Sequence, residues 1–172
     1  MPLYRARAKY RANSYTGSST VANTSAETVF ALTHFIPAYS MKVGKTYRVT
    51  ARGVYGTKAT ASGAMTVSVK LGSTTIGSDS GPGTTAALTN RGWLVQFDFT
   101  VTAVGASGAG EGQGFSTKAI SAINSGVYDM EKTTTTTVNT TIDQTLGLAV
   151  TWFTSDPDNA ITIRQLEVEE LG

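Results

Sequence analysis

The chain has 172 residues, with 14 Lys and Arg against 12 Asp and Glu, one histidine and no cysteine. This length fits a single domain, which would bury about 70% of the surface that its unfolded chain exposes. The absence of cysteine excludes disulfides, thiolate metal sites and thiol nucleophiles, and no apolar run approaches the ~20 residues of a membrane helix. We expect a soluble, non-secreted protein with no membrane partner.

Positive charge is concentrated in the first residues of the chain. Odd positions from 5 to 11 are basic and even positions from 4 to 12 are tyrosine or alanine. Taking these four basic residues from the 14 leaves ten against 12 acidic residues, so the rest carries a net charge of about −2. An extended segment of this pattern has one cationic edge and one small and aromatic face. We predict a basic N-terminal arm and polar hinge over residues 1–25.

Three interpretations of this arm remain open. It is the first strand of the domain or a partly disordered tail, a clasp on a neighbouring subunit or acidic protein surface, or a nucleic-acid contact. Four charges alone bind nucleic acid weakly, so we expect no specific nucleic-acid partner. The candidate partner-binding residues are Tyr4, Arg5, Arg7, Lys9, Tyr10 and Arg11.

Alternation with a period of two predicts strands along the rest of the chain, because successive side chains of a strand point to opposite faces. Pro37 ends the first of these strands, and Trp93 to Val101 forms the most aromatic inward row, which predicts a central strand. A change of parity near Arg164-Gln165 predicts a β-bulge. The predicted strands cover residues 30–36, 45–55, 65–71, 93–101, 146–152 and 161–168.

The segments between these strands are rich in glycine, serine and alanine. We predict loops over Thr57 to Gly63, Ser78 to Gly83 and Gly105 to Gly114, and an edge strand over Thr133 to Thr137. No long segment has the apolar spacing of a helix. The chain is therefore predicted to be all-β, with residues 26–172 forming a two-sheet antiparallel jelly-roll sandwich. An immunoglobulin-like sandwich is the alternative.

The residues required for catalysis or metal binding are sparse. His34 shares its parity with apolar neighbours, which predicts a packed or interface histidine. Asp156, Asp158 and Asn159 resemble half of a calcium loop, but Pro157 favours a plain β-turn. The glycine-rich segment 105–114 leads into no helix and lacks a phosphate-binding lysine. We expect no enzyme, no catalytic or metal-binding residues and no cofactor.

Aromatic residues permit one further interpretation. Tyrosines and tryptophans could form a platform for stacking sugars, yet both tryptophans have inward parity, which favours the core. The residues in question are Tyr39, Tyr55, Trp93, Tyr128 and Trp152.

The pattern of strand and turn residues resembles the small jelly-roll domains of phage and other viral virion proteins, such as head decoration proteins, head fibres and tail-fibre knobs. The likeness spans residues 26 to 171 and includes no catalytic motif. The segments that carry it are Ala26-Glu27-Thr28, Phe35-Ile36-Pro37-Ala38, Val43-Gly44-Lys45, Arg48 to Gly53, Val69 to Gly72, Gly92-Trp93, Thr140-Thr141, Val150-Thr151-Trp152 and Asn159 to Ile163.

This resemblance implies a virion structural protein, most simply a capsid decoration (cement) protein that binds and stabilises the shell as a trimer. Its partners would be the major capsid protein or another virion protein, with the basic arm as the anchor. It would be assembled in the host cytoplasm and located on the capsid surface. The alternative is a β-sandwich that binds a carbohydrate or receptor at a phage fibre or tail tip.

Overall fold

The computed structural model describes residues 9–13, 19–58, 64–79, 87–119, 121, 124–130 and 132–171, and for 9–13 and 132–134 it describes the backbone only. All regular secondary structure in these residues is β-strand. The strands are β1 (Lys9–Asn13), β2 (Ser19–Ala22), β3 (Thr28–Ile36), β4 (Thr46–Thr57), β5 (Met65–Leu71), β6 (Thr74–Ser78), β7 (Leu88–Ala103), β8 (Gly108–Ala119), β9 (Ser125–Asp129), β10 (Lys132–Val138), β11 (Gln144–Trp152) and β12 (Ala160–Leu171).

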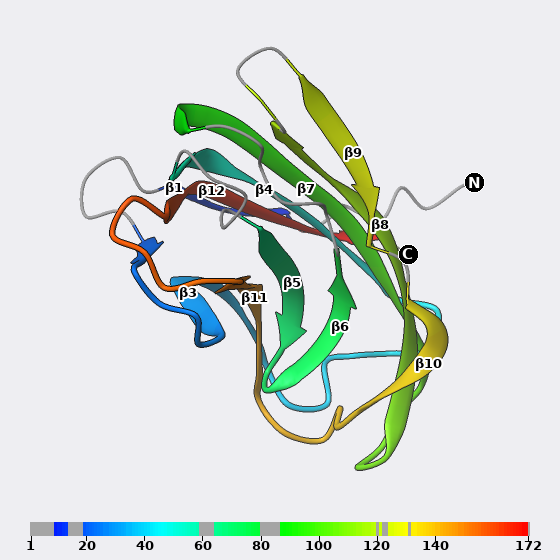
Figure 1. The fold of residues 1–172 in the computed structure, drawn as a ribbon. Helices are drawn as coiled ribbons and strands as arrows, with labels where there is room; N and C mark the ends of the chain where they lie inside the picture. The colour runs from blue at the N-terminus through cyan, green and yellow to red at the C-terminus, as the bar shows by residue number, and fades with distance from the viewer. Residues whose placement is uncertain are drawn as a thin grey trace.

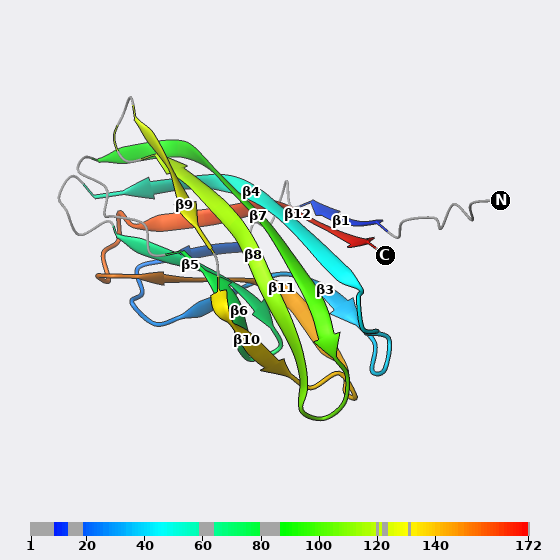
Figure 2. The ribbon, with the colours of Figure 1, turned by 90° about the vertical axis from the view of Figure 1, so that its right-hand side faces the viewer.

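Two antiparallel sheets pack face to face as a sandwich. The larger sheet has the order β1-β12-β4-β7-β8-β10, with β2 also on β12 and β9 also on β8. The smaller sheet has the order β3-β11-β5-β6. Figure 2 shows the two layers from the side, with the larger sheet above the smaller one. The predicted all-β sandwich is confirmed.

The strand pairs are nested within one another, which identifies a jelly roll. The pairs are β5 with β6, β4 with β7, β3 with β11, and β2 with β12, and the sheet alternates from one pair to the next (Figure 1). This is the pattern of one long hairpin rolled into a sandwich. The immunoglobulin-like order, which groups strands ABED and CFG, does not occur. Strands β8, β9 and β10 extend the larger sheet beyond β7.

The core lies between the sheets and consists of the inward rows that the alternation predicts. Trp93, Val95, Phe97, Phe99 and Val101 of β7 are all buried, and β7 lies inside the sheet between β4 and β8. Across the core, Phe30 of the smaller sheet stacks on Trp93 with ring centroids 6.2 Å apart. The predicted central strand and the inward parity of both tryptophans are confirmed.

Two local predictions for the sheets are also confirmed. The register between β12 and β4 shifts between Ile163 and Gln165, so the bulge lies where the parity changes. Strand β10, which contains the threonine tract, is at the end of the larger sheet and, among the described strands, pairs only with β8. The predicted loops over 57–63 and 78–83 lie mostly outside the described residues.

The predicted loop over Gly105 to Gly114 is wrong from Gly108 onward, where strand β8 begins. Three glycines of this segment face the core, where aromatic rings of β7 occupy the space of a side chain. A Cβ at Gly110 would lie 2.2 Å from Cζ of Phe99, and a Cβ at Gly112 would lie 2.3 Å from Cζ of Phe97. Glycine is therefore required here by the size of its neighbours and does not indicate a flexible segment.

Candidate interaction surfaces

The basic arm contributes a strand to the edge of the larger sheet. Residues Lys9, Tyr10 and Arg11 belong to β1, which pairs with β12, while Tyr4, Arg5 and Arg7 lie outside the described residues. Thus residues 9–13 form a first strand of the domain, as the first of the three interpretations predicts. The partner contacts of the six residues stay predictions, as does the boundary after residue 25.

The strand register at this edge places basic and acidic positions opposite each other. The register places Lys9 opposite Glu169 and Arg11 opposite Glu167. Glu169 in turn lies opposite Arg48 of β4, whose guanidinium makes two hydrogen bonds to Asp98 of β7, at 2.9 and 2.7 Å. Opposite charges on directly facing residues stabilise strand pairing and fix its register. Two basic positions of the arm are therefore in register with acidic positions of β12.

One end of the sandwich exposes a group of apolar side chains that the sequence analysis did not identify. They come from the end of β3 and from the β3–β4, β7–β8 and β10–β11 connections, which lie together at the bottom of Figure 1. We call this group the apolar loop end. Its members and their exposed fractions are Phe35 (56%), Tyr39 (68%), Val43 (63%), Val104 (52%) and Ile142 (51%).

Hydrogen bonds around Thr140 hold these connections together. The Thr140 carbonyl accepts from the Tyr39 amide at 2.9 Å, and its Oγ1 accepts from the Gly105 amide at 2.8 Å. The Ala38 amide donates to Asp143 Oδ1 at 2.8 Å. Because all three connections are fixed to one another, a partner that binds here would not have to order them first.

The backbone of Tyr39 is strained. Its φ of 60° is in the left-handed region, which bulky residues rarely adopt and which costs of the order of 1 kcal/mol. The protein maintains this conformation while the ring is 68% exposed. Strained residues with exposed side chains are concentrated at binding sites, so Tyr39 marks the apolar loop end as a candidate interface.

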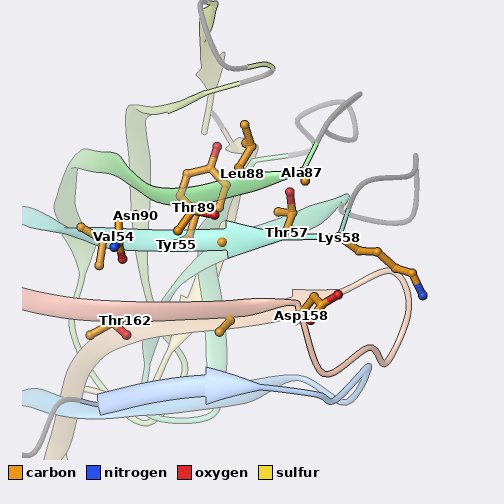
Figure 3. Close-up of a pocket in the computed structure, with 12 residues that line it drawn as sticks. Val54, Tyr55, Thr57, Lys58, Ala87, Leu88, Thr89, Asn90, Asp158 and Thr162 are labelled. Atoms are coloured by element: carbon orange, nitrogen blue, oxygen red, sulfur yellow. The ribbon is translucent and has the colours of Figure 1, made fainter.

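A hollow of about 540 Å³ lies on the outer face of the larger sheet, where β7 begins (Figure 3). Asn90 adopts a φ of 51°, and the register between β4 and β7 shifts beside it, between Tyr55 and Thr57. Figure 3 shows the Lys58 side chain extending away from this hollow. Its ammonium is held by Asp156, 2.7 Å away, which leaves only uncharged or acidic groups over the hollow.

A buried ion pair joins the two sheets. Lys118 Nζ of β8 lies 3.0 Å from Oδ1 of Asp79, which follows β6, and both side chains are almost fully buried. Asp79 also accepts from the Val67 amide of the smaller sheet and from the Ser116 hydroxyl, and Lys118 donates to the Met65 carbonyl. Burial lowers the pKa of Lys118, and the attraction of Asp79 opposes this effect.

This pair is hidden in the sequence because the glycine-rich start of β8 resembles a loop. Once β8 is recognised, Lys118 shares its parity with Gly110, Gly112, Gly114 and Ser116, all of which face inward. A lysine at an inward position of a strand is the signal that could have found the pair, since such a charge requires a buried partner.

Two further predictions are addressed directly by the structure. His34 is half-buried on β3, and burial lowers its pKa while Glu170 opposes the shift. The segment around Asp156 forms the predicted β-turn, with the Asp158 amide donating to Asp156 Oδ1 and the Asn159 amide donating to the Asp156 carbonyl, both at 3.0 Å. Within the described part of the chain there is no group of three or more potential metal ligands.

The aromatic residues considered for sugar stacking do not form one exposed platform. Trp93, Trp152 and Tyr55 are buried, with exposed fractions of 3% or less, whereas Tyr39 is exposed at the apolar loop end. Tyr128 covers the ammonium of Lys118 at 5.2 Å from the ring centroid.

No helix in the described residues has the length and apolar character that a membrane crossing requires. Comparison with known proteins adds no relatives: no family model, no curated protein and no solved structure matches this chain.

Proposed function

We propose that this chain is a structural protein of a virion, and specifically a capsid decoration protein that binds the assembled shell as a homotrimer. The observation that carries the proposal is the apolar loop end, where five exposed apolar side chains project from the end of β3 and from three connections that hydrogen bonds fix to one another. Preorganised apolar groups are typical of a surface that binds another protein.

Three other features support this proposal. The jelly-roll order agrees with the resemblance to virion proteins. Charged residues make up only 15% of the chain, which suits packing between subunits. Arg5 and Arg7 precede β1 in the sequence, and in this proposal they contact an acidic partner surface. In this arrangement β1 anchors the arm to its own domain and residues 1–8 contact the shell.

Replacing Tyr39 and Ile142 by serine should weaken attachment to the shell by about 30-fold or more, because removing a central interface aromatic costs about 2 kcal/mol. The measurement is cosedimentation of the purified chain with shells of the major capsid protein encoded in the same genome. Both side chains are more than half exposed, so the thermal unfolding midpoint should not change.

A truncation that removes residues 1–8 tests the arm separately. It leaves β1 intact, whereas a deletion to residue 15 would also expose the edge of β12 and favour aggregation. Phe153→Ser is the matched control, since Phe153 is 80% exposed but follows β11 outside the apolar loop end. Undiminished attachment of both the double serine variant and the truncation would refute the decoration role.

Light scattering should give a solution mass three times that of one chain. The Tyr39 and Ile142 variant should keep this mass if the apolar loop end faces the shell, and should become monomeric if it forms the trimer contact. A wild-type mass of one chain at micromolar concentration would rule out the preformed trimer.

A further inference from the structure

A second hollow, of about 420 Å³, lies on the outer face of the larger sheet where β8 changes its pairing partner. Strand β9 pairs with β8 from Phe115 to Ala119, and β10 pairs with it from Gly108 to Gly112. Between the two, the chain turns inward at Met130, whose side chain is fully buried and whose amide donates to the Gly114 carbonyl. The outer face beside Gln113 is therefore left uncovered.

The side chains around this hollow combine one aromatic ring with amides and carboxylates. Across three strands, Gln96, Phe115 and Asp129 are direct neighbours, and in the adjacent row Asp98 faces Gln113. These residues point outward, because the residues that alternate with them, such as Phe97 and Phe99, are buried in the core. The Phe115 ring is partly exposed, and its two neighbours within the row are both hydrogen-bonding groups.

One of the acceptors is fixed in position before any ligand binds. Arg48 donates from Nε to Asp98 Oδ1 at 2.9 Å and from Nη2 to Oδ2 at 2.7 Å, and the carboxylate remains about one-third exposed. A two-point hydrogen bond of this kind holds the carboxylate plane and leaves its remaining lone pairs available. The exposed Val127, which also lines the hollow, adds an apolar contact.

We propose that this hollow is a saccharide-binding site. The apolar face of one pyranose ring would pack on Phe115, and the ring hydroxyls would hydrogen-bond to Gln96, Gln113 and the carboxylates of Asp98 and Asp129. Amides both donate and accept, and carboxylates accept from neighbouring hydroxyls, so together they match a polyol. The lining contains two carboxylates and no basic side chain, which disfavours a phosphate or nucleic-acid ligand. The volume is within the range of about 300–1,000 Å³ that small-molecule sites occupy.

This site is independent of shell attachment, because its residues lie on the outer face of the sheet and the apolar loop end contributes none of them. The test begins with an array of immobilised bacterial and animal glycans. Saturation-transfer NMR then uses the methyl glycosides of glucose, galactose, mannose, rhamnose and N-acetylglucosamine. The wild-type chain should be retained on the array, and its saturation transfer should be strongest at the ring protons of one sugar face.

Phe115→Ala should weaken binding about tenfold, and Gln113→Ala should weaken it about threefold, since each removes one of several contacts. Gln113 is exposed, so its variant should fold even where the loss of Phe115 perturbs the sheet. Phe153→Ala is the control and should bind like the wild type. Absence of any retained glycan or methyl glycoside overturns the proposal, as does binding that neither Phe115→Ala nor Gln113→Ala weakens.

Discussion

Alanine at Gly112 is expected to lower the free energy of unfolding by about 3 kcal/mol, because overpacking a filled core costs about 1–3 kcal/mol and more where backbone must move. The added Cβ would lie 2.3 Å from Cζ of Phe97 and 2.6 Å from the Ile76 carbonyl oxygen. The ring is fixed within the core, and the carbonyl belongs to the opposite sheet. Urea unfolding followed by tryptophan fluorescence measures the change.

Gly92→Ala is the matched control for this substitution. Gly92 also lies within a strand of the larger sheet, but a Cβ there would have no neighbour within 4 Å. The control should be neutral or stabilising by about 0.5 kcal/mol, since alanine reduces the conformational freedom of the unfolded chain. Equal effects of the two substitutions would mean that the Phe97 ring does not cover β8.

Breaking the buried ion pair between Lys118 and Asp79 should lower the free energy of unfolding about as much as the Gly112→Ala substitution. Asp79→Asn leaves the ammonium facing a neutral amide, and Lys118→Met leaves a carboxylate with fewer donors. Each single change should lower the free energy of unfolding by about 3–5 kcal/mol, the usual cost of an unpaired buried charge. The double variant carries no charge at this buried site, so its loss should be smaller than the sum of the two, with a coupling of about 2 kcal/mol.

The surface pair of Lys58 and Asp156 provides the comparison for this cycle. Its nitrogen-to-oxygen distance of 2.7 Å is shorter than that of the buried pair, but the Lys58 side chain is 46% exposed. Lys58→Met should therefore leave the unfolding midpoint nearly unchanged, because water already solvates this charge. Strictly additive losses in the Lys118 and Asp79 cycle would show that the two groups are not paired in solution.

The sequence predicted the sandwich wherever a strand had one apolar and one polar face. Strand β7 satisfied this condition from Trp93 to Val101, and the parity change at Arg164 located the bulge in β12. Strand β8 could not be predicted in the same way, because the inward positions Gly110, Gly112 and Gly114 carry no side chain to reveal the alternation. The rings of Phe97 and Phe99, on strand β7, occupy the space that such side chains would fill.

The candidate surfaces were predictable only in part. Alternating charge indicated an extended arm, and residues 9–13 are indeed a strand, but the acidic residues opposite them belong to the last strand of the chain. The apolar loop end is assembled from the end of β3 and three connections, and each contributes one or two apolar residues that look unremarkable in sequence. Strand order, which alternation does not determine, brings Tyr39, Val104 and Ile142 to the same end.

The nested pairing also sets the order in which this molecule can be made. Its outermost pair joins β2, near the start of the chain, to β12, near its end, so the sandwich cannot close on a ribosome until the last strand has emerged. Until β11 has emerged, the inward row of β7 has no complete opposite layer and remains open to neighbouring nascent chains. Contacts this distant in sequence slow folding to milliseconds or seconds in comparable all-β domains. Synthesis rate and chaperone supply should therefore govern the yield of this protein more than the stability of its finished core.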